Sequence, residues 1–272
     1  MKSDVIVSGK NYQADLMSPV DISIPLLFDG PQPNFFGVYP ASAKPYETNG
    51  FIGDTRQGGS CNVKEYKLIS HCNGTHTECV GHIVNQNIFI NTILQEVLIP
   101  ATLITINAQA AKDTSETYIP KLEDDDWLIT KGELIASLAN SQKDFLSGLV
   151  IRTVPNEDSK KFRNYSQLPA PFFTIEAIEY LNDLQIKHLV VDIPSVDRAN
   201  DQGKMTIHHL FWGVEQGSHD INKNNISNKT ITEMVFIPDE VKDGYFLLNI
   251  QIPSFTSDAA PSRPVLFNLN MD

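Results

Sequence analysis

Histidine, cysteine and glutamate residues are concentrated in residues 70–83, which read SHCNGTHTECVGHI. Three of the chain's seven histidines, His71, His76 and His82, lie in this segment together with Glu78. Side chains two positions apart in an extended segment point to the same face, so His76 and Glu78 can act together. Imidazole and carboxylate groups suit zinc, manganese or iron. The segment therefore predicts a metal site that keeps an open position for water.

The same segment allows two other interpretations. Cys72 lies beside His71 and close to His76, and a cysteine–histidine pair can form a thiolate nucleophile. The polar side chains could instead belong to a loop in which neighbours satisfy one another by hydrogen bonds. A nucleophilic cysteine needs two oriented partners, and the residues around Cys72 are more typical of a metal shell, so the metal site is favoured.

Composition excludes several classes of protein. The chain has 272 residues, of which 41% are hydrophobic and 20% charged, as is usual for a globular protein with a sizeable core. The net charge of -12 argues against a nucleic-acid partner. We find no apolar run long enough to cross a bilayer and no apolar signal-peptide core at the start. The three cysteines, Cys61, Cys72 and Cys79, make a poor disulfide framework, so we expect a cytoplasmic protein.

The elements that must position the histidines alternate between strands and helices. Residues 171–197 are the clearest unit: Thr174 can cap a helix, Glu176 lies in its first turn, and a buried strand follows at residues 187–195. A further short helix is expected at residues 131–140. Other strands are expected at residues 20–28, around Pro100, and at 148–154, 245–252 and 263–269. This order predicts an α/β protein with a mixed sheet and one domain, 1–272, in which residues 1–19 are an N-terminal extension.

Residues 31–51 are rich in proline, glycine and aromatic side chains. Such a composition is typical of an ordered loop, here expected over a pocket. Phe35, Phe36 and Tyr39 could line an apolar pocket for a planar substrate, or simply pack the loop itself.

The histidine-rich segment resembles a known family. CNGTHTECVGH, residues 72–82, is similar to the signature H-x-G-T-H-x-D-x-P-x-H of cyclase-like metal hydrolases, which include bacterial kynurenine formamidase and isatin hydrolase. Similar landmarks follow in the same order from about residue 20 onward: APFFTIEAIEYL, DIPSVDR, HHLFW, TITEMV and DAAPSRPVLF. The resemblance implies a swivelling β/β/α-type fold that carries one or two divalent ions, with zinc favoured and manganese possible.

The resemblance also implies a role for each matching residue. His76 is implied as a metal ligand, Glu78 as a ligand or bridge, His208 as the later ligand and Glu233 as its partner. His82 stands where the family has its general acid/base. His208 is preferred to the neighbouring histidine because of its spacing from the apolar pair that follows it.

The sequence departs from the family pattern at the first ligand. Cys72 stands where the family has histidine, and His71 lies one residue earlier. If a regular strand runs through Gly74, Cys72 shares one face with His76 and Glu78 and faces the cavity. A bulge at the glycine would instead turn His71 inward. Further departures are the longer carboxylate of Glu78, Val80 in place of proline, and a long polar segment, residues 213–232, in which we expect His219 to be exposed.

These features predict a metal-dependent hydrolase that cleaves a C–N amide bond in an N-formyl aryl amide or a cyclic amide. Two alternatives remain open: a lactone-opening or dehydratase enzyme at the same site, and a binding protein whose metal site has decayed. We expect a small-molecule substrate, no nucleic-acid or membrane partner, and a homodimer or homotetramer.

Overall fold

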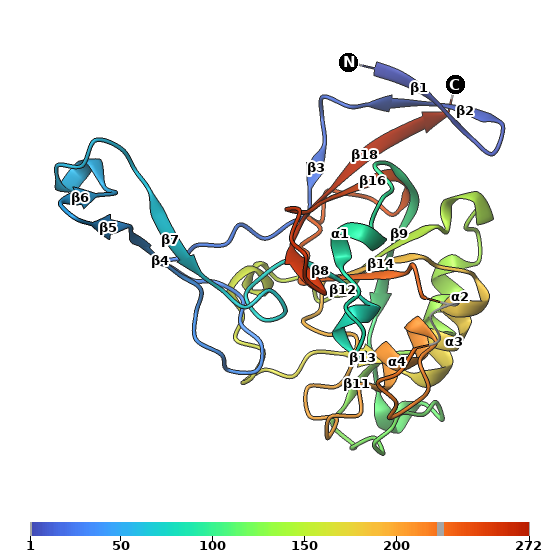
Figure 1. Ribbon diagram of the computed structural model, residues 1–272. Helices are drawn as coiled ribbons and strands as arrows, with labels where there is room; N and C mark the ends of the chain where they lie inside the picture. Colours follow the sequence, from blue (N-terminus) through green and yellow to red (C-terminus); the bar gives the residue numbers. More distant parts are fainter. Residues whose placement is uncertain (1, 222–225, 272) are drawn as a thin grey trace.

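A large mixed β-sheet forms the centre of the molecule in the computed structural model, which describes residues 2–221 and 226–271 (Figure 1). In spatial order its strands are β1 (Lys2–Val7), β2 (Lys10–Asp15), β18 (Arg263–Met271), β16 (Gly244–Gln251), β9 (Ile99–Asn107), β12 (Gly148–Val154), β14 (His188–Val191), β15 (Thr230–Glu233), β8 (His76–Cys79) and β17 (Ala259–Pro261), with β3 (Val20–Asp21) beside β18.

The four central strands, β9, β12, β14 and β15, run parallel, and the strands on either side of them run antiparallel. Every residue of β12 except the last is buried, as expected for a parallel strand that is covered on both faces. Parallel strands place their carboxyl ends along one edge of the sheet. The predicted α/β class with a mixed sheet is therefore confirmed.

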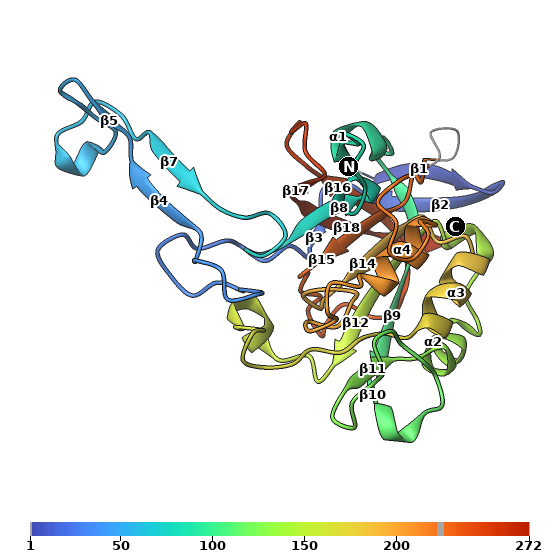
Figure 2. The ribbon, with the colours of Figure 1, turned by 60° about the horizontal axis from the view of Figure 1, so that its bottom comes forward.

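Three helices, α2 (Lys131–Leu138), α3 (Ile175–Asp183) and α4 (Thr206–Trp212), pack side by side against this sheet (Figure 2). Thr174 caps α3 as predicted, since its side-chain oxygen accepts a hydrogen bond from the Ala177 amide at 3.1 Å. The short helix α1 (Ile90–Ile93) contacts β8. Among the described residues, no helix is both long and apolar enough to span a membrane.

Short elements complete the fold. The 3₁₀ turns are η1 (Thr55–Gln57), η2 (Val80–His82), η3 (Ala111–Asp113), η4 (Lys143–Phe145) and η5 (Asp158–Phe162), and a small sheet consists of β10 (Gln109–Ala110), β11 (Trp127–Ile129) and β13 (Phe172–Phe173).

The strand expected at residues 20–28 is mostly absent from the described structure. Only β3 forms, and beyond it Ser23 makes a single bridge to Val235. Proline lacks the amide donor that a ladder needs, and Pro25 lies two residues after Ser23. The prediction of a regular strand over this range is therefore wrong.

An arm, residues 42–67, projects away from the body of the molecule (Figures 1 and 2). Its base is the pair β4 (Ser42–Pro45) and β7 (Lys64–Lys67), and its tip holds β5 (Glu47–Thr48), β6 (Phe51–Ile52) and η1. Residues 31–51 were expected to be a loop over a pocket. Only their first part lies over a cavity, because the chain enters the arm at Ser42.

Candidate metal centre

A cavity of about 280 Å³ lies where β14 and β15 end and β8 begins. Six residues singled out from the sequence line it: His71, Cys72, Glu78, His82, His208 and Glu233. Phe35 and Phe36 also line this cavity, whereas the Tyr39 side chain is 83% exposed.

Strand pairing explains how residues far apart in sequence meet here. β15 and β8 are antiparallel neighbours, and their register places Glu233 directly opposite His76. The Nε2 atom of His76 lies 3.4 Å from Oε2 of Glu233. The other carboxylate oxygen of Glu233 accepts a hydrogen bond from the Val196 amide at 2.8 Å, which fixes the carboxylate toward His76.

His208 reaches the same cavity from the helix α4. Its Nδ1 atom lies 2.5 Å from Oδ2 of Asp197, and its Nε2 atom lies 2.9 Å from Oε1 of Glu78. Asp197 also accepts the backbone amide of Ile207 at 2.8 Å, so it holds the start of the helix and the imidazole together. The neighbouring His209 points elsewhere, with its ring 6.5 Å from that of His219.

His71 and His82 form a stacked pair beside Glu78, with ring centroids 4.0 Å apart. His71 Nδ1 lies 2.8 Å from Oε2 of Glu78, and its Nε2 lies 2.8 Å from Oδ2 of Asp258. The same Asp258 oxygen is 3.4 Å from Nδ1 of His82. Asp258 therefore holds both imidazoles at the mouth of the cavity.

The strand that was expected to run through Gly74 begins only at His76. Residues 70–75 form turns and bends, and Gly74 has a φ of 98°, which is outside the strand region. The regular register on which the choice of Cys72 rested is thus wrong, and His71 turns its ring toward Glu78.

Cys72 also lines the cavity, but its chemistry differs from that of His71. Burial, reinforced by the negative charge of Glu233, raises the pKa of the Cys72 thiol to about 11, so the thiol is protonated at neutral pH. Among the described residues, ligand atoms gather in three overlapping groups, none of which includes Cys72: His71, His76 and Glu78; His71, His82 and Asp258; and Glu78, His82 and His208.

The charges in the cavity are strongly coupled. Burial alone would raise the pKa of Glu78, but the neighbouring His82 and His208 charges and the hydrogen bonds from His208 and His71 hold it well below its usual value. Burial would lower the pKa of His71, but its hydrogen bonds to Asp258 and Glu78 raise it to about 10. Glu78 and Asp258 therefore both stabilise a positive charge on His71, which lies between them, and a cation site requires the same negative potential.

The donor set fits a divalent cation, and His76 is the most direct sign of it. Its Nδ1 lies 3.1 Å from the Gly74 carbonyl oxygen, so Nδ1 carries the proton and donates it there. This tautomer leaves a lone pair on Nε2, which is buried and has no hydrogen-bond partner among the described residues. His208 differs, because its Nδ1 donates to Asp197 and its Nε2 donates to Glu78 at 2.9 Å. Buried imidazole lone pairs beside carboxylates are typical of zinc or manganese ligands.

Sequence reasoning assigned no role to Asp197 and Asp258. Both lie within segments that carried the family resemblance, DIPSVDR and DAAPSRPVLF. Asp258 precedes β17, whose pairing with β8 sets Ala259 opposite Glu78. The position of Asp197 after a helix and a strand, and of Asp258 before a short edge strand, could have marked them as candidates. Only the tertiary pairing of the strands shows that they lie at the site.

The sequence matches the Cyclase family, described as "Putative cyclase", over residues 15–198. A search of curated proteins gives no match.

Solved structures share the fold over almost the whole chain. A predicted metal-dependent hydrolase from Bacillus stearothermophilus is 18% identical, with a TM-score of 0.58 over 92% of this chain and 98% of that chain. Isatin hydrolase A from Labrenzia aggregata, bound to benzyl benzoate, is 15% identical, with a TM-score of 0.61 over 92% and 93%. An isatin hydrolase bound to the product analogue thioisatinate is 17% identical, with a TM-score of 0.59 over 93% of each chain.

The family match includes the histidine-rich segment and the loop that carries Asp197. The matched range covers most of the chain, and the solved structures have the same α/β architecture. The resemblance inferred from the sequence is therefore confirmed: the chain belongs to the Cyclase family.

Proposed function

We propose that the protein is a metal-dependent hydrolase that cleaves a C–N amide bond in an N-formyl aryl amide or a cyclic amide. The observation that carries this proposal is the buried Nε2 of His76, which lacks a hydrogen-bond partner among the described residues and lies 3.4 Å from the Glu233 carboxylate. Membership of the Cyclase family and the fold shared with isatin hydrolases support the reaction class, since isatin is a cyclic amide.

The proposed metal-binding side chains are His71, His76, Glu78, His208 and Glu233. Glu78 has a central place among them, because its Oε1 faces His208 and its Oε2 faces His71. A carboxylate whose two oxygens face different imidazoles can hold one ion or bridge two. Nitrogen and oxygen donors of this kind favour zinc, with manganese as the second choice.

When bound, a divalent cation supplies Lewis acidity toward a carbonyl oxygen and toward water. The protein contributes the proton transfer. His82 is our proposed general acid/base, since its side chain is about a quarter exposed at the cavity and its Nδ1 lies 3.4 Å from Asp258. Asp258 orients that ring, so Nε2 can take a proton from water and pass it to the leaving nitrogen.

Two further groups prepare the site for a planar substrate. Phe35 and Phe36 give the cavity an apolar wall against which an aryl or cyclic amide can lie. Asp197 fixes the tautomer and ring orientation of His208, as outer-shell carboxylates do for ligating histidines.

The test is a substrate panel with the metal-loaded protein: N-formyl aryl amines, cyclic imides and lactones. We expect hydrolysis of an amide that is lost in Glu233→Gln, and no comparable loss in Glu240→Gln, an exposed carboxylate outside the site. Turnover of lactones alone would favour the lactone-opening alternative. A folded protein that neither binds metal nor turns over any substrate would favour the binding-protein alternative.

We further propose that the protein is a cytoplasmic homodimer or homotetramer. The three cysteines are free thiols, which suits a reducing compartment. A two-stranded ribbon is only marginally stable by itself, and the arm exposes Tyr46, Val63 and Tyr66, so a second copy is its natural partner. Light scattering of the wild type against Tyr66→Glu tests this, and a monomeric wild type would contradict it.

A further inference from the structure

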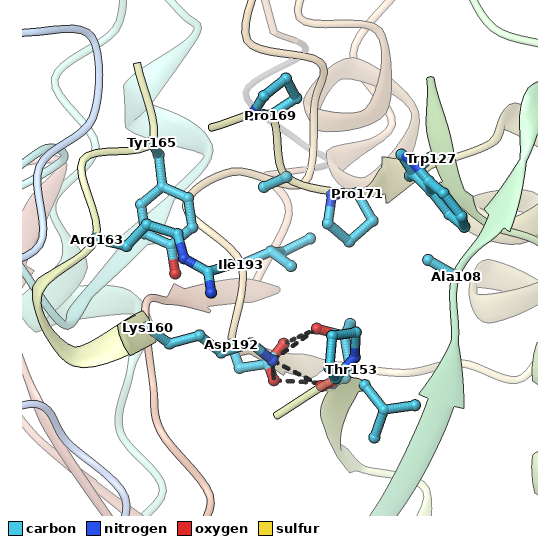
Figure 3. Close-up of a pocket in the computed structure, with 13 residues that line it drawn as sticks. Ala108, Trp127, Thr153, Lys160, Arg163, Tyr165, Pro169, Pro171, Asp192 and Ile193 are labelled. Carbon is cyan, nitrogen blue, oxygen red and sulfur yellow. Dashed lines mark hydrogen bonds and ion pairs between the residues drawn. The ribbon is translucent and has the colours of Figure 1, made fainter. Parts of the chain in front are cut away.

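A second cavity, of about 200 Å³, lies at the carboxyl ends of three neighbouring parallel strands (Figure 3). Ala108 follows β9, Thr153 lies near the end of β12, and Asp192 follows β14. In the part of the chain that the structure describes, this cavity shares no lining residue with the candidate metal centre. The carboxyl edge of a parallel sheet is where open α/β proteins usually bind ligands.

The floor of this cavity is a buried ion pair. Lys160 Nζ lies 2.7 Å from Oδ2 of Asp192, and their side chains are only 5% and 0% exposed. Thr153 donates its amide and its hydroxyl to the same carboxylate at 2.8 and 2.9 Å, and its carbonyl accepts from Lys160 at 2.6 Å. Removing two charges from water is costly unless they are well paired, and these hydrogen bonds fix both side chains in place. The proposed hydrolysis does not use this pair.

Arg163 adds an unsatisfied donor to the wall. Its Nη2 donates to Glu157 at 3.0 Å and to Ser159 at 2.6 Å. Its Nε is buried and has no partner among the described residues. Lys160 pairs with Asp192 within the cavity. Glu157, which pairs with Arg163, is 61% exposed and is not among the residues that line the cavity, so Arg163 is the cation that a ligand there would meet. A cationic donor that lacks an acceptor is best satisfied by an anionic oxygen.

The rest of the cavity lining is mostly apolar. Figure 3 shows Trp127 and Pro171 on one side of the cavity and Tyr165 beside Arg163 on the other, and Trp127 is about half exposed. The Arg163 guanidinium lies 5.7 Å from the centre of the Tyr165 ring. Aromatic and proline faces accept a planar ring. The volume is smaller than the roughly 300–1,000 Å³ of pockets for larger ligands, so it admits a single ring.

We propose that this cavity is a second binding site, which takes a small aromatic monocarboxylate with its carboxylate on Arg163 and its ring against Trp127 and Tyr165. The site lies apart from the metal centre and does not depend on the proposed hydrolysis. The Lys160–Asp192 pair forms its floor and prevents repulsion between Asp192 and the bound anion.

The experiment measures the dissociation constant of 4-fluorobenzoate by fluorine NMR with the full-length, metal-loaded protein. The neutral 4-fluorobenzamide serves as the isostere without charge. We expect the carboxylate to bind, and Arg163→Gln to weaken it by about tenfold or more, because a hydrogen bond to a charged group is lost. Arg263→Gln, an equal charge change on an exposed side chain, is the matched control and leaves binding unchanged.

Two further variants locate the site. His76→Ala disables the metal centre and is expected to leave benzoate binding intact, whereas Trp127→Ala is expected to weaken it. The proposal is overturned if the carboxylate does not bind, if the amide binds equally well, or if His76→Ala abolishes binding. It is also overturned if neither Arg163→Gln nor Trp127→Ala, tested as folded proteins, weakens the complex.

Discussion

Replacing His71 by alanine is expected to weaken metal binding strongly, whereas replacing Cys72 by serine is not. His71 Nδ1 lies 2.8 Å from Glu78, within the group of ligand atoms that also includes His76. Four-ligand zinc sites bind with about 10–16 kcal/mol, so one ligand contributes about 3 kcal/mol, or about 10²-fold in affinity. Cys72 belongs to none of the groups of ligand atoms found among the described residues, so Cys72→Ser removes no ligand.

The assay is competition for zinc against a chromogenic chelator, with folding of each variant checked by circular dichroism. His219→Ala is the control, because this histidine is exposed and, among the described residues, its ring hydrogen-bonds the backbone carbonyl of Ile83. Full metal affinity in His71→Ala together with a large loss in Cys72→Ser would refute the reasoning, and would restore the ligand that strand register alone favours.

Three further predictions concern rate, stability and pH. His82→Ala is expected to keep its metal and to lose about 10²–10⁴ in kcat, and a metal-free variant would instead make His82 a ligand. Thr174→Ala is expected to lower the free energy of unfolding by about 1–3 kcal/mol in urea titrations, because the hydroxyl caps α3 and donates to Glu116 at 2.6 Å; an unchanged midpoint would contradict this. The pKa of His71 is raised to about 10 in the folded protein, above the unfolded value of about 6.5. Its stabilisation is therefore complete below pH of about 6.5 and is lost as the pH rises to about 10. Metal-free wild type should lose stability over this window more steeply than His71→Gln, and parallel thermal melts would argue against it.

The sequence was sufficient for elements whose signals are local. The cap at Thr174 and the buried strand at residues 148–154 formed as predicted, and β14 formed as a shorter strand within the predicted residues 187–195. Capping and continuous apolar runs act over a few residues. The strand at residues 20–28 failed where Pro25 removed a donor. The projecting arm at residues 42–67 was not predicted, because the pairing of β4 with β7 joins segments that are separated in sequence.

The residues of the candidate site could be predicted where their signals are local or belong to the family pattern. His76 and Glu78 follow from spacing, and the family landmarks pointed to His208 and Glu233, which the fold brings into the same cavity as Glu78. Asp258 reaches the site only through the pairing of β17 with β8, and that contact is tertiary. The choice between His71 and Cys72 depended on a regular strand, which the positive φ of Gly74 prevents.

Metal analysis of the protein purified without chelator tests the central claim most directly. The donor geometry around His76 and Glu233 predicts about one to two equivalents of zinc or manganese per chain, and a clear loss of metal in a folded His76→Ala variant. A folded wild-type protein that holds no divalent metal, and takes up none when zinc or manganese is supplied, would contradict the account.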